Sequence, residues 1–439
     1  MMLLTALTLC LTACHDDDEP EGYTPPTRAS RTVLVYMSGE NNLTVTSGLN
    51  LTVTSGVRFL NNDLQEIIEG SKALGADQRL LVFVDSLNTN SEQSSTPYII
   101  EVHDGKAREL YKYDHHFYAS DPANFREVID RAFAYAPADS YGLVLWGHAT
   151  GWLVDEDSIA SASSRPRRAY GVDYGRNADP GNPYKWMNIT QMARALVGLP
   201  KLAFIFADCC NMMCAEVGYE LRNATDYLIG SPAEIPGDGA PYHLLQSALF
   251  KDGQQMYKGI IDTYYNHYLE RSRNSYSLPL SVISTQHIEA LAQATHDVLT
   301  QFEPACPVYP KYPNMRKDSI VLYLHADYDA PVMYDMRAFV KANTSDEVFR
   351  QWDTYYQRAV PYYRMSMVWT TMYSNMMADF STFKEDESVN GCVSMYVPQN
   401  TTIYNSSSYC YNQTFNQMEW NRVVDWSRFG WGDTDDNPW

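Results

Sequence analysis

Short apolar runs alternate with longer amphipathic stretches from residue 31 onward, and this alternation constrains the fold more than any other feature of the chain. The runs are rich in Val, Leu, Ile and Phe, which is typical of strands buried on both faces. Strands that alternate with helices in this way predict a mostly parallel α/β sheet with helices on both sides. The predicted strands are 31–37, 79–85, 98–102, 141–146, 202–206, 227–230 and 278–284, and the predicted helices are 124–136, 189–199 and 216–224.

The first 14 residues have the features of an export signal. Residues 1–13 are apolar but too few to span a bilayer, and they resemble the core of a secretory signal peptide. Leu11-Thr12-Ala13-Cys14 resembles the bacterial lipobox, which predicts that Cys14 is lipidated. The acidic run 15–19 resembles the export tag of surface lipoproteins in Bacteroides-like bacteria. A plain signal peptide with an incidental cysteine is the alternative.

Composition sets the broad class and the domain plan. Hydrophobic residues make up 45% and charged residues 20%, as in an ordinary globular protein, and the net charge of −20 argues against nucleic acid as a partner. We expect a signal peptide over 1–14, a flexible tether over 15–30 and a main domain over 31–390. No Gly/Ser-rich or Pro-rich linker separates 391–439, so we expect this extension to pack on the same domain.

Two strand ends carry residues suited to thiol chemistry. His148 follows the predicted strand 141–146 after one glycine, and Cys210 follows the strand that ends near 206. In an open α/β sheet, groups at the carboxyl ends of neighbouring strands gather in one crevice. Cys210 would enter a helix, whose N-terminus lowers a thiol pKa. The pair therefore predicts a nucleophile and its base, although each residue alone is more often structural.

The remaining cysteines allow other interpretations. A metal site formed by Cys209, Cys210 and Cys214 is the competing hypothesis, but the spacing contains no paired C-x2-C and no histidine nearby in sequence. In an exported protein a disulfide among Cys306, Cys392 and Cys410 is also open.

Four sequence stretches resemble the clostripain family of cysteine peptidases, which are relatives of caspases, gingipains and legumains. The resemblance is clear over 31–242 and looser beyond. It implies a caspase-like α/β/α sandwich with C-terminal additions. The stretches are Tyr36-Met-Ser-Gly-Glu-Asn-Asn-Leu43, the W-x-H-x-x-G-W motif at 146–152, Asp208-Cys-Cys210-Asn-Met212 with Glu216-Val and Tyr219-Glu-Leu221, and Gly230 to Tyr242.

The resemblance also implies roles for single residues. Counting back from Glu216 places the family's nucleophile on Cys210, with His148 as the base. The backbone amides of Ala149 and Cys210 would form the oxyanion hole. Asp208 and Asp238 would line an acidic S1 pocket for Arg or Lys at P1, the residue before the cleaved bond. Alternatively, Asp208 caps the next helix and Asp238 is a turn residue.

A polar stretch over 155–164 precedes Arg165-Pro-Arg167-Arg168 and reads as an exposed loop. Several family members are processed into two chains between the histidine and the cysteine. We therefore predict self-cleavage after Arg168, with Arg167 as the alternative, which makes Ala169 a new N-terminus. A basic loop that is never cut is the other interpretation.

Together these features predict an exported cysteine endopeptidase that cleaves proteins or peptides after Arg or Lys. We expect an outer-membrane lipoprotein on the surface or in the periplasm of a Gram-negative bacterium, monomeric and nicked into two chains. No cofactor or metal is required by the motifs; some family members need calcium, so calcium stays open. The alternatives are a catalytically inactive relative that binds peptides or host ligands, and an adhesin or scaffold lipoprotein.

Overall fold

The computed structural model describes residues 23–44, 59–88, 94–153, 170–173, 185–300, 320–324, 333–370, 377–379, 389–397, 415 and 417–426. Among these residues no helix has the length and the apolar character needed to cross a membrane.

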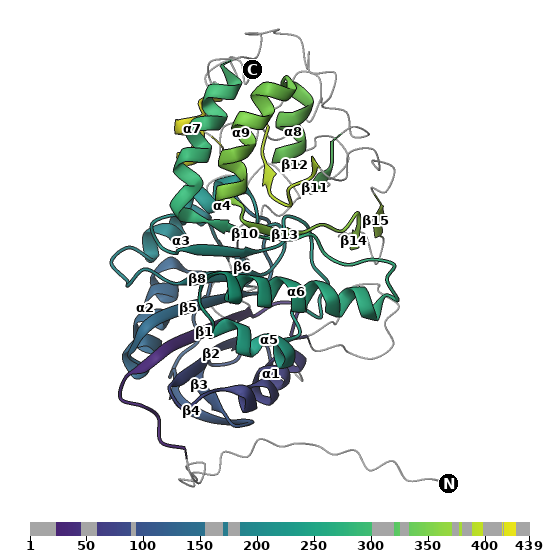
Figure 1. Ribbon diagram of the computed structural model, residues 1–439. Helices are drawn as coiled ribbons and strands as arrows, with labels where there is room; N and C mark the ends of the chain where they lie inside the picture. The colour runs from purple at the N-terminus through teal and green to yellow at the C-terminus, as the bar shows by residue number, and fades with distance from the viewer. Residues whose placement is uncertain are drawn as a thin grey trace.

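Within the described residues the main sheet has nine strands, in the order β13-β10-β9-β8-β5-β1-β2-β3-β4 (Figure 1). The five strands β9, β8, β5, β1 and β2 pair in parallel, while the pairs at both edges are antiparallel. The strands are β1 (Ala29–Gly39), β2 (Gln78–Ser86), β3 (Tyr98–His103), β4 (Lys106–Lys112), β5 (Ala138–Trp146), β8 (Phe204–Asp208), β9 (Tyr227–Gly230), β10 (Leu280–Ser284) and β13 (Tyr362–Arg364).

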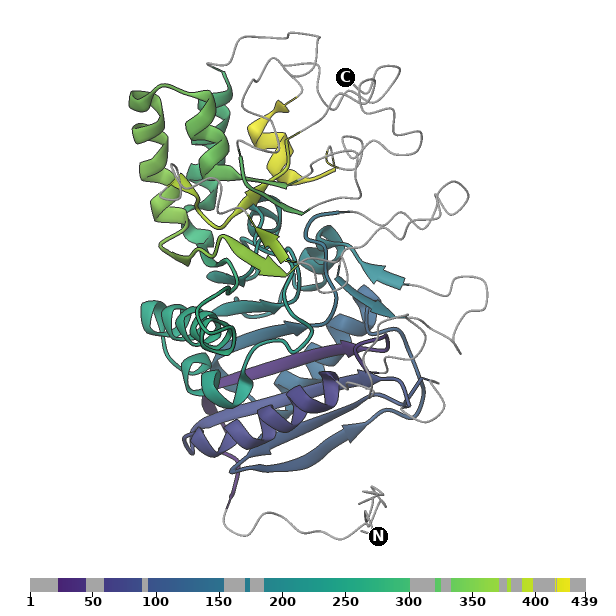
Figure 2. The ribbon, with the colours of Figure 1, turned by 90° about the vertical axis from the view of Figure 1, so that its right-hand side faces the viewer.

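Two hydrophobic cores lie on opposite faces of this sheet because successive side chains of a strand alternate between the faces. In β1, Leu34 and Tyr36 face the core that α2 covers, whereas Val33 and Val35 face the core under α1, α5 and α6. Figures 1 and 2 show these helices as layers flanking the sheet. Their bounds are α1 (Phe59–Gly70), α2 (Pro122–Tyr135), α3 (Ile189–Ala195), α4 (Ala215–Glu220), α5 (Tyr242–Leu249) and α6 (Gly253–Arg271).

The later part of the chain packs beyond β10 and β13, at the top of Figure 1. It shares the first of the two cores, because residues such as Phe339, Trp352 and Trp420 belong to the same cluster as Leu34. Its helices are α7 (Ile288–Leu299), α8 (Met336–Asn343), α9 (Asp346–Ala359) and α12 (Glu419–Val424). The small sheets are β11 (Leu322–Leu324), β12 (Met333–Asp335) and β16 (Ser394–Met395), then β14 (Val368–Thr370) with β15 (Met377–Asp379), and β6 (Tyr170–Asp173) with β7 (Lys185–Met187).

The mostly parallel α/β prediction is confirmed, with differences of detail. The strand expected at 202–206 is β8 at Phe204–Asp208, and the helix expected at 216–224 is the shorter α4. Strand β4 was not predicted, because Lys106–Lys112 lies at the sheet edge and carries mostly polar, exposed side chains.

Candidate active site

The ends of β5 and β8 bring His148 and Cys210 to one edge of the sheet. These strands pair in parallel, and their last residues, Trp146 and Asp208, are register partners. His148 and Cys210 each lie two residues beyond that pair. Because neighbouring strands are about 4.8 Å apart, this register brings both residues to the same end of two adjacent strands.

His148 is half-buried and is held from two sides. Its Nε2 lies 2.7 Å from Oδ1 of Asn42, in the turn after β1. An amide oxygen only accepts, so this contact assigns the proton to Nε2 and leaves Nδ1 as the basic nitrogen. The amide of Gly171 also donates to the His148 carbonyl at 2.8 Å.

Cys210 is half-buried, whereas the neighbouring thiols of Cys209 and Cys214 are fully buried. The Sγ of Cys210 accepts the backbone amide of Ile235 at 3.4 Å. Burial raises the pKa of Cys209 and Cys214 well above the ordinary value, which keeps them as inert thiols. Of the three, Cys210 has the exposure that a nucleophile requires.

The helix after Cys210 begins within one residue of its predicted start, but Cys210 does not lie at its N-terminus as expected. Helix α4 begins at Ala215 with Cys214 as its N-cap, so Cys210 lies several residues before the first residue of the helix. The intervening chain bends at Asn211, whose φ of 59° is left-handed. Its course is fixed because the amides of Asn211 and Met213 donate to carbonyls that follow β9. The same finding rules out Asp208 as the cap of α4.

Asp208 lies beneath this edge, with 2% of its surface exposed. Its Oδ2 accepts the Tyr242 hydroxyl at 2.8 Å and the Ala240 amide at 3.1 Å, and its Oδ1 accepts the Tyr264 hydroxyl at 2.9 Å. Burial raises the pKa of Asp208, and these three donors oppose that rise.

A second buried carboxyl, Asp63 of α1, lies beside Asp208 and was not predicted from the sequence. A Cβ added to Gly239 would lie 2.9 Å from Oδ2 of Asp208 and 3.0 Å from Oδ2 of Asp63, so both carboxyl groups face that glycine. The indole of Trp146 donates to Asp63 at 2.6 Å. Burial, reinforced by the charge of Asp208, raises the pKa of Asp63 from 3.8 to about 9.

Comparisons with known proteins identify the family. The Clostripain family model, Peptidase_C11, matches residues 35–431. The chain belongs to the clostripain family. It is therefore a cysteine peptidase, and its fold is that of this family's solved structures. No curated protein matches the chain.

Three solved structures are similar over nearly the whole fold. One is a secreted C11 cysteine protease from Bacteroides thetaiotaomicron in complex with an irreversible peptide inhibitor, at 28% identity and TM-score 0.69, covering 91% of this chain and 99% of that one. An inactive zymogen C11 protease from Parabacteroides distasonis has 24% identity and TM-score 0.69 with the same coverage. A second secreted C11 protease from Bacteroides thetaiotaomicron, iotapain, has 19% identity and TM-score 0.67 and covers 91% of this chain and 100% of its own.

Ala149 and Asp238, the other predicted site residues of this clostripain-family chain, differ in how buried they are and in what they contact. Ala149 is buried next to His148 and forms an isolated antiparallel bridge with Tyr170. Asp238 is exposed, and its carboxylate lies 3.0 Å from the guanidinium of Arg271 on α6. The structure thus buries Asp208 among hydrogen-bond donors and gives Asp238 a cationic partner within the chain.

Several predictions concern residues outside the described ranges, namely Cys14, Arg167, Arg168, Ala169, Cys306 and Cys410. Cys392 is described, and it is a buried free thiol. It therefore forms no disulfide with Cys306 or Cys410.

Asn42 is the other residue that sequence reasoning missed. It lies in the stretch Tyr36–Leu43 that resembled the family, but nothing in its spacing connects it with a histidine 106 residues later. Only the parallel pairing of β1 with β5 places the two side chains together.

Proposed function

We propose that this protein is an exported endopeptidase that cleaves after Arg or Lys, with Cys210 as nucleophile and His148 as base. The observation that carries the proposal is the register of β5 and β8, which sets these two residues two positions beyond paired strand ends. The Cys210 thiolate attacks the carbonyl carbon of the P1 residue, and His148 takes up the thiol proton and returns it to the leaving amine. Water then hydrolyses the thioester.

The oxyanion of the tetrahedral intermediate needs two donors near the nucleophile. We assign them to the backbone amides of Ala149 and Cys210. Ala149 directly follows the base and is held in its bridge with Tyr170. In this bridge the Gly171 amide bonds the carbonyl of His148, a neighbour of Ala149. Strand β6 therefore supports the base and the proposed donor together.

Specificity for a basic P1 residue would come from Asp208, assisted by Asp63. Neither carboxylate forms an ion pair with a lysine or arginine in the described part of the chain. A buried carboxylate without a cation is costly, so a bound guanidinium or ammonium would favour the ionised form of Asp208 and oppose the raised pKa of Asp63. Asp238 would join the pocket only by giving up Arg271, so we assign it the smaller part.

Self-cleavage after Arg168 would create Ala169 as an N-terminus one residue before β6. The start of β6 is already anchored at the site, because the Tyr170 hydroxyl donates to the carbonyls of Tyr36 at 3.3 Å and Trp146 at 3.2 Å. Cleavage there would release the preceding loop without disturbing this anchor. We expect intact chain to become two fragments by mass spectrometry, and Arg168→Ala to slow or shift the cut to Arg167.

Export rests on the amino-terminal pattern, with Cys14 as the lipidated residue. The B. thetaiotaomicron protein at 28% identity is secreted, which supports the same compartment for this chain. Radiolabelled palmitate should enter the wild-type protein and not Cys14→Ala, and the absence of label in both would leave a plain signal peptide.

The deciding experiment is hydrolysis of short fluorogenic peptides with Arg, Lys, Ala or Asp at P1, by the purified chain from residue 27 onward. We expect turnover with Arg or Lys only. Cys210→Ala should abolish it, while the matched control Cys209→Ala keeps it. Absence of turnover after trypsin nicking near Arg168 and added calcium would instead favour the inactive, ligand-binding relative.

A further inference from the structure

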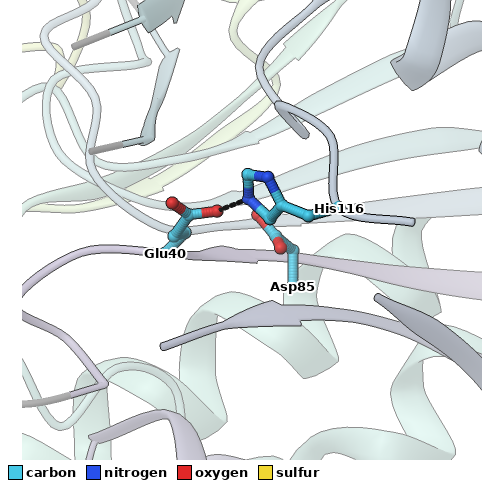
Figure 3. Close-up of side chains that lie close together, drawn as sticks. All are labelled: Glu40, Asp85 and His116. Atoms are coloured by element: carbon cyan, nitrogen blue, oxygen red, sulfur yellow. Dashed lines mark hydrogen bonds and ion pairs between the residues drawn. The ribbon is translucent and has the colours of Figure 1, made fainter. Parts of the chain in front are cut away.

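A second cluster of titratable side chains lies at the ends of β1 and β2, away from Cys210. Glu40 follows β1, Asp85 lies near the end of β2, and His116 reaches them from the chain before α2 (Figure 3). One potential ligand atom from each lies within 4.8 Å of the other two. The Nε2 of His116 contacts a carboxylate oxygen of Glu40.

Asp85 lacks a strong hydrogen-bond donor in the protein. The residue is 0% exposed, and neither carboxylate oxygen has a hydrogen-bond partner of good geometry. The Ser86 backbone and the carboxyl of Asp173 act on its pKa only as weak hydrogen-bond neighbours. Its position is fixed because Asp85 pairs in register with Ser38 of β1. Buried polar groups in native proteins nearly always have hydrogen-bond partners. A buried carboxylate that lacks them and faces other potential metal ligands therefore indicates a missing ligand.

Apart from His116, the charged groups around the cluster are acidic. Asp173 of β6 is also fully buried nearby, and its Oδ2 accepts the Ser120 amide at 2.7 Å and the Ser120 hydroxyl at 2.8 Å. Burial and the charges of Asp173 and Glu40 raise the pKa of Asp85 well above its usual range. Among the described residues, no lysine or arginine forms an ion pair with Glu40, Asp85 or Asp173. A ligand suited to this cluster would therefore be a cation.

We propose that Glu40, Asp85 and His116 bind a divalent transition-metal ion of the Mn²⁺ or Zn²⁺ class. Two carboxylates and one imidazole nitrogen, with water in the remaining positions, suit these ions. Calcium, which the family resemblance left open, is bound in proteins by six to eight oxygen ligands, and an imidazole does not fit that set.

The metal would fix the chain on which the base depends. Glu40 and Asn42 lie two residues apart, and Asn42 holds His148. The side-chain amide of Asn41, between them, donates to the Val172 carbonyl at 2.9 Å, next to Asp173. An ion that neutralises Glu40 and Asp85 would stabilise the turn after β1 and its contact with β6. This effect on His148 rests on the proposed function, whereas metal binding does not.

Binding is tested with the whole chain carrying Cys210→Ala, so that the catalytic thiol cannot hold the metal. After treatment with a chelator, Mn²⁺ is titrated while the electron paramagnetic resonance signal of free Mn²⁺ is followed, and Zn²⁺ and Ca²⁺ are added as competitors. We expect one ion per chain, displaced by Zn²⁺ more readily than by Ca²⁺. Asp85→Asn and His116→Ala should each weaken Mn²⁺ binding by more than about 10-fold. A loss of about 10-fold is the lower end of what is seen for residues that only support a metal ligand.

The control is Asp262→Asn, which removes a carboxylate paired with Arg364 on another part of the surface. It should bind Mn²⁺ like the parent. Asp85→Asn keeps the size of the side chain, and its thermal unfolding without metal shows whether it folds. Absence of Mn²⁺ and Zn²⁺ binding, or equal binding by folded Asp85→Asn, would overturn the proposal. So would Ca²⁺ binding that His116→Ala leaves intact.

Discussion

Replacing Asp63 by asparagine should stabilise the protein at neutral pH, by an amount that grows as the pH rises. In the folded protein the pKa of Asp63 is about 9, whereas its ordinary value is 3.8. The folded state therefore keeps a proton that the unfolded state releases. The stability linked to this proton is complete below pH 3.8 and is lost progressively as the pH rises toward about 9.

The magnitude follows from linkage. Each pH unit inside this window lowers the free energy of unfolding by about 1.4 kcal/mol for a single group. Between pH 5 and pH 7 the wild type thus loses about 2.7 kcal/mol through Asp63. Asparagine has no such proton, and its amide oxygen can still accept the Trp146 indole that now bonds Asp63.

The assay is urea unfolding at pH 5, 6 and 7 of two chains, one with Cys210→Ala and one with Asp63→Asn added. The Cys210→Ala background prevents digestion of unfolded chains. Since every other titrating group is common to both, only the difference in the free energy of unfolding matters. We expect it to widen by about 2.7 kcal/mol from pH 5 to pH 7. A constant difference would refute the assignment of a buried, protonated carboxyl.

Three further predictions address the site and its support. Cys209→Ala should keep kcat/KM within about twofold and leave iodoacetamide labelling of the protein unchanged. The Cys209 thiol is buried and has a raised pKa, so it does not react. Loss of labelling would mean that the wrong cysteine was assigned as the nucleophile. Asn42→Ala should lower kcat about 10-fold with KM little changed, because the 2.7 Å contact that orients His148 is worth ~1.4 kcal/mol. An unaltered kcat would contradict the positioning role of Asn42. Gly142→Ala should lower the free energy of unfolding by about 1–3 kcal/mol in urea, because the added Cβ would lie 2.4 Å from the Phe204 ring; unchanged stability would show that the ring moves at no cost.

Much of the fold could be predicted because local pattern and burial agree in the central strands. β1, β2 and β5 are apolar runs with both faces covered, so period and composition identify them without knowledge of their neighbours. The edge strands β4 and β13 could not be found in this way. Their side chains are exposed or only partly buried, and their pairing comes from the adjacent strand and not from their own residues.

Some features of the candidate site could likewise be predicted from the sequence, and others could not. His148 and Cys210 could be identified from the sequence because each directly follows an apolar strand, and a nucleophile and base are short-range signals of residue type and position. The expectation that Cys210 lies at a helix N-terminus was wrong, since hydrogen bonds to the chain after β9 hold the residues between Cys210 and Ala215 outside the helix. That constraint comes from a distant strand and has no local signature.

By itself, then, the sequence determined the central strands and the family, and it indicated the pair of side chains that we propose to react. Only the tertiary structure decided what surrounds them. Asp63 meets Trp146 across 83 residues of sequence, and Glu40 meets His116 across 76. Such long-range contacts depend on the register of the parallel strands. The carboxyl groups acquire their altered pKa values only when folding buries them.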